Sequence, residues 1–324
     1  MTWLRHAAIG ALCVLAQSAL AQGAADYPSR PIQMIIPLAA GSAGDVALRI
    51  VAAKMSGDLG KQIVIDNQPG AAGAIGAERA TRAAPDGYTI VGISDSVLTS
   101  VPLLNKNARF DRLKDFAPVS QIVTNEWVLV AHPSFAAKTV QELIELAKAK
   151  PDQIDFSSGG NGSPQQMAME LFKARTGVRL VHVPYRGATG ALTDVVAGTV
   201  PLMFTAIAVA QPFLKDGKLR ALATGGPRRS DLLPDVPTAA EAGVAGFEWS
   251  TWTSIMAPAN TPAEIIARLN TTALAALKDA EVREKLLALG VVPNGNSPDA
   301  FKVNLARDYA RMAEIIRAAG IKVD

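Results

Sequence analysis

The chain has 324 residues, of which 49% are hydrophobic and 19% are charged, and its formal net charge is +3 at pH 7. Basic and acidic residues are interspersed, which excludes a concentrated basic surface and predicts neither a nucleic-acid nor a membrane-surface partner. The only cysteine is Cys13, so the chain beyond it has no disulfide, thiol nucleophile or thiolate metal site.

The first residues have the pattern of a secretory signal peptide. Arg5 gives a positive start, residues 7–16 form an apolar run, and residues 19–21 are Ala-Leu-Ala, with small residues where a signal peptidase reads. The run is too short to span a membrane. We expect a signal segment over residues 1–21, reaching to about 25 at most, and a periplasmic protein. A leucine precedes Cys13 where a lipoprotein signal requires a small residue, so lipidation is not expected.

Beyond the signal segment, short β-rich runs alternate with helical patterns. The expected strands are residues 32–36, 63–65, 88–93, 127–131, 180–183, 201–204, 219–224 and 253–257. The expected helices include residues 45–59, 140–149, 165–176 and 188–198, and roughly the last 60 residues keep a helical apolar period. This alternation predicts an α/β fold of parallel sheets with helices on both faces. We find no internal sequence repeat.

Helix starts carry specific signals. Two Thr-x-x-Glu patterns, at 139–142 and 261–264, predict capping boxes in which each side chain satisfies a free backbone N–H of the first turn. Pro262 and Pro298 are expected at first helical positions, where the missing N–H of proline has no cost.

Domain boundaries are less clear from the pattern. About 300 residues after the signal segment suit two domains better than one. Two stretches, 118–133 and 244–258, have the composition of crossings between domains. If the chain crosses twice, one domain contains residues 26–125 together with 250–324, and the other contains residues 126–249.

One candidate binding loop follows the first expected strand. Small residues there lead into a helix, so backbone N–H groups at a positive helix end are available to an anion. The alternative is a tight turn that needs glycine for its dihedral angles, and for this loop alone it is the better interpretation. The candidate ligand contacts are Leu38, Ala39, Ala40, Gly41, Ser42 and Asp45.

A second loop, at 157–164, has the same character and leads into the expected helix at 165–176. Ser163 is a natural N-cap, and Pro164 suits the first turn. Two such loops, one in each expected domain, could face each other across a cleft, which makes binding a stronger interpretation than for either alone. The candidate contacts in the second loop are Gly160, Asn161, Gly162, Ser163 and Gln165.

Three further residues are candidates at strand ends. Ser94 and Ser96 follow the expected strand 88–93, at the edge where open α/β sheets bind ligands, although a helix cap is an equally good interpretation. Arg186 follows the strand at 180–183 and could clamp a carboxylate. A surface or interdomain charge is the slightly better interpretation of Arg186.

The sequence has no nucleophile elbow, Walker loop or zinc-protease motif. After the signal segment it has two histidines, His132 and His182, and both are expected to be structural. A secreted hydrolase that uses Ser163 is therefore a poor alternative. No cluster has metal-ligand spacing, so we expect neither an enzyme nor a cofactor.

Ordered motifs along the chain identify it as resembling the Bug family, the solute-binding receptors of tripartite tricarboxylate transporters. These motifs are YPSRPI at 27–32, PLAAGSAGD at 37–45, PDGYT at 85–89, HPS at 132–134, GNGSPQ at 160–165, VPYRG at 183–187, GKLRAL at 217–222, PDVPT at 234–238 and EAG at 241–243. The resemblance extends from Tyr27 to the end of the chain.

The resemblance implies a type II periplasmic-binding-protein fold, with two doubly wound α/β domains and a ligand cleft between them. It implies a small carboxylate ligand, either a di- or tricarboxylate, an amino acid or an aromatic acid, and delivery to a membrane permease. In the family, the loops that match 37–45 and 159–165 grip one carboxylate. The far end of the ligand would then contact Thr205 and Arg186.

This chain departs from the family pattern at several site positions. Leu38 replaces a common aromatic residue, Ser42 a glycine, Gln166 a histidine, and Thr205 an acidic residue. The loss of the acid at 205 argues against an amino-acid ligand, because an ammonium group would need it. Preferential binding of aspartate or glutamate would contradict this hypothesis.

The expected function is a periplasmic receptor, monomeric, that captures a di- or tricarboxylate or an aromatic acid for a tripartite-type permease. The ligand would favour a closed form in which it contacts both domains. The alternative partner is the ectodomain of a sensor kinase, in which case the protein would signal rather than transport. The sequence does not separate these two roles.

Overall fold

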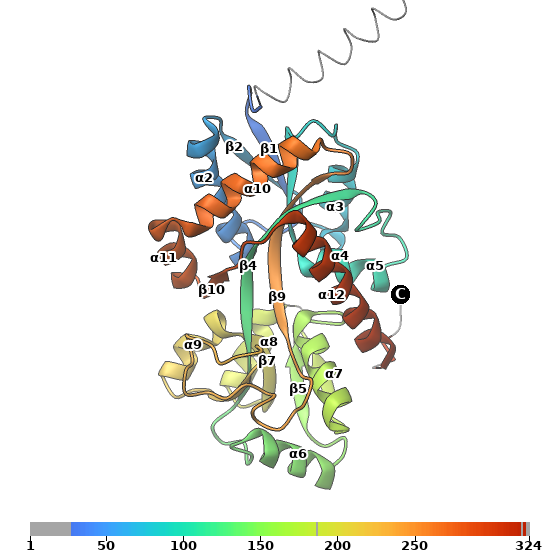
Figure 1. Cartoon of the computed structure of the whole chain (residues 1–324). Coiled ribbons are helices and arrows are strands. Elements are labelled where there is room, and N and C mark those ends of the chain that lie inside the picture. The colour runs from blue at the N-terminus through green and yellow to red at the C-terminus, as the bar shows by residue number, and fades with distance from the viewer. Residues whose placement is uncertain (1–26, 186, 319, 322–324) are drawn as a thin grey trace, which may run out of the picture.

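A computed structural model describes residues 27–185, 187–318 and 320–321. The helices and strands lie in two lobes, one above the other in Figure 1, and two long strands pass between them. These strands are β4 (Phe116–Ala131) and β9 (Ser250–Pro258). None of the described helices is long and apolar enough to cross a membrane.

The upper lobe combines the early and late parts of the described chain. Its early elements are β1 (Ile32–Ile36), α2 (Ala43–Leu59), β2 (Ile63–Asn67), the 3-10 turn η1 (Ala71–Gly73), α3 (Ala74–Thr81), β3 (Thr89–Ser94), α4 (Asp95–Thr99) and α5 (Val101–Leu104). Its late elements are α10 (Ala263–Lys278), α11 (Ala280–Ala288), β10 (Val291–Pro293) and α12 (Pro298–Ala318).

The lower lobe is one continuous stretch of chain. It contains α6 (Val140–Ala149), β5 (Asp155–Ser158), α7 (Pro164–Thr176), β6 (Val181–Pro184), α8 (Ala188–Val196), β7 (Leu202–Ala206), α9 (Ile207–Lys215) and β8 (Arg220–Thr224). The order β5-α7-β6-α8-β7 repeats β1-α2-β2-α3-β3, and the strands align as β6-β5-β7 and β2-β1-β3. The lobes therefore repeat one topology although the sequence shows no repeat.

The strands form one path, β2-β1-β3-β9-β4-β7-β5-β6, and β8 and β10 also pair with β4. The pairs of β1 with β2 and β3, and of β5 with β6 and β7, are parallel as predicted. The prediction is wrong for the strands between the lobes: β4 and β9 pair antiparallel with each other and with their other partners. The reason is topological, since one carries the chain down and the other carries it back.

Strand β4 is much longer than expected. The predicted strand 127–131 is only its last third, because Pro118 and several polar residues interrupt the apolar pattern before it. The register with β9 shifts between Pro118 and Ser120 and again between Gln121 and Val123, as β-bulges do. Bulges let a strand keep its pairing while it bends from one lobe into the other.

Alternating side chains place a hydrophobic core on each face of the sheet. In β1, Ile32, Met34 and Ile36 pack with α2 and α10, whereas Ile35 packs with α3 and α4 on the other face. The lower half of β4 does the same, with Leu129 on one face and Val130 on the other. This two-residue period explains helices on both faces of the sheet in both lobes.

Two helix starts agree with prediction and one does not. Thr139 accepts the N–H of Glu142 at 3.2 Å, and α12 begins at Pro298. At the second predicted capping box, the Thr261 hydroxyl instead donates to the Pro258 carbonyl at 2.8 Å. Pro262 has extended dihedral angles (φ −53°, ψ 141°) and precedes the helix rather than beginning it. The hydroxyl closes the turn after β9, and α10 begins without a side-chain cap hydrogen bond.

Helix α12 belongs to the cores of both lobes. Phe301 and Leu305, in its first half, are fully buried with Trp252 in the upper lobe. Ile315 and Ile316, near its end, are buried in the lower-lobe core, where α12 runs beside α7 (Figure 1). The lobes are therefore joined by this helix as well as by the two crossing strands.

Candidate ligand-binding site

The first candidate loop is held in shape by Asp45. The N–H of Gly41, which has a positive φ of 80°, donates to Asp45 Oδ2 at 2.9 Å. Ser42 is the N-cap of α2, and its hydroxyl accepts the N–H of Asp45. The carboxylate also accepts Arg49 Nε at 2.9 Å and Asn67 Nδ2 at 2.8 Å. Both carboxylate oxygens of Asp45 are hydrogen-bonded within the protein, and its role as a ligand contact stays a prediction.

These contacts decide the charge of Asp45. Desolvation acts to raise its pKa, but hydrogen bonds from Arg49, Asn67 and Gly41 outweigh it and hold the pKa below the ordinary value. Asn67 Nδ2 also contacts the Leu38 carbonyl at 3.2 Å, so the same group ties down both ends of the loop. The negative charge is thus paired with Arg49 and remains beside the helix N-terminus.

The second loop repeats two hydrogen bonds that shape the first. Gly162, with a φ of 76°, donates its N–H to Gln166 Oε1 at 2.7 Å, and Gln166 donates its N–H to the hydroxyl of Ser163. The N-caps Ser42 and Ser163 have almost the same dihedral angles, −66° and 154° against −68° and 153°. Gln166 is therefore the counterpart of Asp45, which the sequence did not indicate because the two side chains differ in charge.

The two helix starts leave different donors available. The first backbone N–H groups of a helix precede its first internal hydrogen bond. In α2 these include Ala43 and Gly44, whereas in α7 the first residue, Pro164, has no N–H and Gln165 supplies the donor. The remaining predicted contacts of these loops, Ala39, Ala40, Gly160 and Asn161, lie on the segments leading to the two caps.

Thr253 lies between the first loop and the candidate residues Ser94 and Ser96. It pairs with Ser94 across β9 and β3, and Ser94 Oγ lies 3.1 Å from Ser96 Oγ. A Cβ on Gly44 would lie 3.1 Å from Thr253 Oγ1 and 2.9 Å from Leu38 Cδ1. Gly44 therefore lets α2 start close against β9. Sequence reasoning missed Thr253, whose only signal was a hydroxyl at the start of an expected strand.

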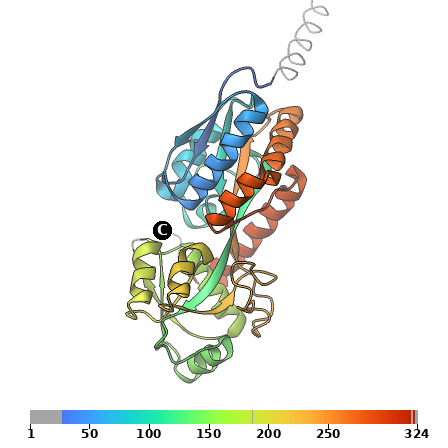
Figure 2. The same cartoon turned by 90° about the vertical axis from the view of Figure 1, so that its left-hand side faces the viewer.

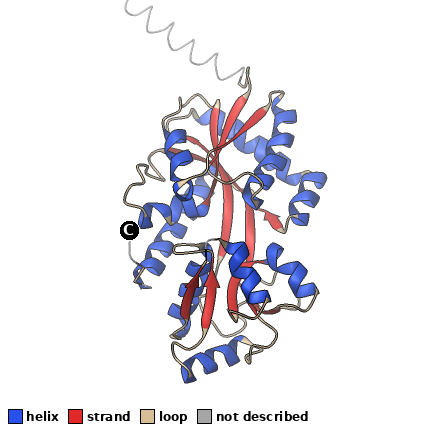
Figure 3. Cartoon of the chain, turned by 180° about the vertical axis from the view of Figure 1, so that it is seen from behind, coloured by secondary structure: helices blue, strands red, loops and turns tan. Residues whose placement is uncertain are grey.

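The second loop meets the upper lobe at α5. A Cβ on Gly162 would lie 2.8 Å from Leu104 Cδ1, and Leu104 packs against the lower-lobe core. Figure 3 shows lower-lobe strands that end toward the upper lobe, the edge from which this loop emerges. Thr205, near the end of β7, is 2% exposed and pairs with Val128 of β4. Arg186 lies outside the described residues.

The histidines have structural surroundings. His182 Nε2 lies 2.5 Å from Ser158 Oγ, and Ser158, which is fully buried, also accepts the N–H of Gly160. His182 stacks on Phe156, and burial lowers its pKa, so it stays neutral near pH 7. His132 Nδ1 contacts Ser134 Oγ at 2.7 Å. The Ser158–His182 pair supports the base of the second loop. The Ser158 hydroxyl is buried there, so a substrate cannot reach it.

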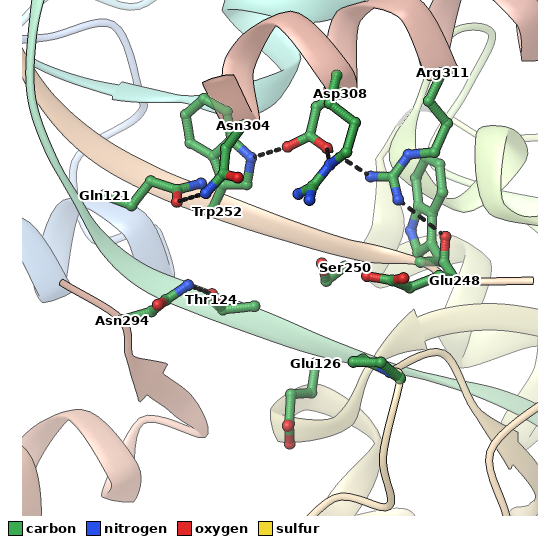
Figure 4. A pocket seen from close by; sticks show the side chains of 14 residues that line it. Gln121, Thr124, Glu126, Glu248, Ser250, Trp252, Asn294, Asn304, Asp308 and Arg311 are labelled. Atoms are coloured by element: carbon green, nitrogen blue, oxygen red, sulfur yellow. Dashed lines mark hydrogen bonds and ion pairs between the residues drawn. The ribbon is translucent and has the colours of Figure 1, made fainter. Parts of the chain in front are cut away.

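A polar pocket of about 210 Å³ lies on another part of the junction between the lobes, against β4, β9 and α12. In Figure 4, Asp308 accepts the Trp252 indole N–H at 2.8 Å and forms an ion pair with Arg311, which donates to the Glu248 carbonyl. None of the predicted site residues lines this pocket. Its polar side chains hold α12 to the crossing strands.

Asp95 lies between Ser94 and Ser96 in the chain and close to the charged pair of Asp308 and Arg311. Desolvation and the nearby Asp308 carboxylate raise the pKa of Asp95 from 3.8 to about 7, although its carboxyl also accepts the N–H of Ser96. The folded chain therefore holds a proton between pH 4 and 7 that the unfolded chain releases. Stability falls as pH rises through this window, by up to ~1.4 kcal/mol per pH unit.

We expect Asp95→Asn to remove this pH dependence. The amide oxygen can still accept the Ser96 N–H, so the variant should match the parent protein at pH 4 and exceed its stability at pH 8. Urea unfolding measured at each pH by tryptophan fluorescence tests the prediction. Parallel stability profiles for the two proteins across this range would show that Asp95 ionises normally.

The chain is similar to known proteins over nearly its whole length. A sequence profile described as the tripartite tricarboxylate transporter family receptor matches residues 47–321. Protein BugT of Bordetella pertussis (strain Tohama I) is 35% identical over 318 residues, covering 98% of each chain.

Solved structures agree in fold over nearly the same length. The periplasmic binding protein BugD is 30% identical with a TM-score of 0.75, covering 91% of this chain and 99% of its own. An R. palustris protein solved with adipate is 32% identical with a TM-score of 0.79, and the shares are 91% and 99%. MatC of Rhodopseudomonas palustris with bound malate is 30% identical with a TM-score of 0.74, and the shares are 90% and 100%. These relatives are solute-binding proteins rather than enzymes, and this chain belongs to the tripartite tricarboxylate transporter receptor family.

Proposed function

We propose that this protein is a periplasmic receptor that captures a small dicarboxylate, tricarboxylate or aromatic acid and delivers it to a tripartite-type membrane permease. The observation that carries the ligand class is the pair of matched loops at 37–45 and 159–165. Each ends at a serine-capped helix N-terminus, where backbone N–H groups favour a carboxylate. Relatives solved with adipate and malate support the same class.

The proposed contacts of the carboxylate held between the two loops are neutral. N–H groups of Ala43, Gly44 and Gln165 would bind the carboxylate from two sides, with hydroxyls of Ser94 and Thr253 nearby. Neutral dipoles avoid the desolvation cost of a buried ion pair. They also keep binding reversible, so that the ligand can be released. Thr205 and Arg186 remain proposals for contacts with the far end of the ligand.

We also propose the domain limits and the export of the chain. The first domain would contain residues 26–125 with 250–324 and the second residues 126–249, with β4 and β9 as hinges. The N-terminal pattern supports a signal peptide over residues 1–21, and the relatives that are periplasmic binding proteins support that location. Mass spectrometry of the mature protein from the periplasm tests this, with cleavage after Ala21 expected.

The binding experiment uses protein stripped of ligand by unfolding and refolding. Thermal shift is measured with adipate, malate, citrate and benzoate, and with aspartate and glutamate as amino-acid controls. A carboxylate at 100 times its Kd is expected to add about 2.7 kcal/mol of stability. Trp127, Trp249 and Trp252, which lie on or next to the crossing strands, provide a fluorescence signal. Failure of every acid to stabilise demonstrably folded protein would contradict the proposed function.

A further inference from the structure

Gly290 and Ala208 bring the two lobes into close contact. Gly290 follows α11 in the upper lobe, and Ala208 lies in the first turn of α9 in the lower lobe. A Cβ on Gly290 would collide with the Ala208 Cβ and would lie 2.7 Å from the Ala208 Cα, a distance that Cβ atoms do not tolerate. Both α11 and α9 face the viewer in Figure 2. A backbone neighbour cannot rotate away as a flexible side chain can, so only glycine permits this approach.

Each partner belongs firmly to its own lobe. Leu286 and Val291, which flank Gly290, are buried in the upper-lobe core with β1 and α2. Ile207 and Ala210, which flank Ala208, are buried against the lower half of β4. The contact therefore joins two packed units, and any added volume must move one lobe relative to the other.

The contact lies on the edge that carries the candidate site. Helix α9 follows the carboxyl end of β7, which is parallel to β5, and the second loop follows the carboxyl end of β5. Parallel strands end at the same edge of a sheet. The distance between the lobes at Gly290 is thus coupled to the distance between the two loops.

We propose that Gly290 is a positioning residue: its lack of a side chain sets how closely the lobes approach, and so how well the two loops engage one carboxylate together. This rests on the proposed function, because it assumes that the ligand is bound between the loops. A receptor that reaches its binding-competent form less often loses apparent affinity in proportion.

Gly60 provides a matched control. It has a φ of 68° against 71° for Gly290, and both follow helices of the upper lobe. A Cβ on Gly60 would meet nothing within 4 Å. Gly60→Ala and Gly290→Ala therefore impose the same backbone strain, and only Gly290→Ala adds a collision. Ala208→Gly in the Gly290→Ala background removes the methyl group from the other side.

The first readout does not need a ligand. Spin labels on exposed positions of the two lobes, Val64→Cys and Val181→Cys, report the distance between lobes by electron paramagnetic resonance. We expect a longer or broader distance distribution in Gly290→Ala, the parent distribution in Gly60→Ala, and partial return in Gly290→Ala with Ala208→Gly.

The second readout is affinity for adipate and malate. For whichever acid the parent protein binds, Gly290→Ala should raise Kd at least about tenfold, Gly60→Ala should change it less than about twofold, and the double variant should recover part of the loss. Equal distances and affinities in Gly290→Ala and Gly60→Ala would overturn the proposal. If the parent protein binds neither acid, the distance measurement still decides whether Gly290 spaces the lobes.

Discussion

Asp45→Ala should weaken carboxylate binding at least tenfold and lower stability by about 2–3 kcal/mol, because it removes the acceptor around which the first loop is built. Asp45 is 1% exposed and accepts hydrogen bonds from Gly41, Arg49 and Asn67. Without it, the glycine at positive φ is no longer fixed, and the N–H groups at the start of α2 lose their orientation.

Asp45→Asn separates positioning from direct contact with ligand. The amide retains an acceptor for Gly41 but removes a negative charge beside the proposed anion site. We expect affinity for a carboxylate to be retained or improved, with stability between those of the parent and Asp45→Ala. Asp58→Asn, at an exposed carboxylate on the same helix, controls for net charge. Calorimetric titration with adipate and malate, together with urea unfolding, gives both quantities. If Asp45→Asn and Asp45→Ala lose affinity equally, the carboxylate itself is required.

Ile315→Asp should destabilise the protein by more than about 3 kcal/mol, because it places a charge in an apolar core. Ile315 is 3% exposed in the lower-lobe core, although α12 begins in the upper lobe. Val303→Asp is the matched control, since Val303 lies on the same helix with 68% exposure and the change should cost less than about 0.5 kcal/mol.

A helix shared by two cores also couples their unfolding. We expect the parent protein to unfold in one urea transition and Ile315→Asp to unfold its lower lobe first. Circular dichroism follows the helices of both lobes. In a background without Trp127 and Trp249, which lie in the lower-lobe core, Trp252 fluorescence follows the upper-lobe core. Equal stability of Ile315→Asp and Val303→Asp would show that the end of α12 does not pack in the lower lobe.

The sequence by itself determined the local structure around the proposed site. Glycine, serine and proline act through their own backbone preferences, so the cap at Ser163 and the start of α12 at Pro298 were predictable without any neighbour. Alternating apolar residues fixed which side chains of β1 face each core. The α/β class and the family resemblance depend on such short-range patterns, and both are confirmed.

The tertiary structure decided everything that depends on a partner distant in the chain. Whether Thr261 caps a helix or closes a turn depends on the Pro258 carbonyl, and the length of β4 depends on pairing with β9 across bulges. Asp45 could be proposed as a site residue from the sequence, but its hydrogen bonds to Asn67 and Arg49 depend on the fold. Gly290 contacts Ala208 across the lobes, and α12 is buried in the cores of both lobes. No local sequence pattern specifies which surfaces two packed lobes bring together.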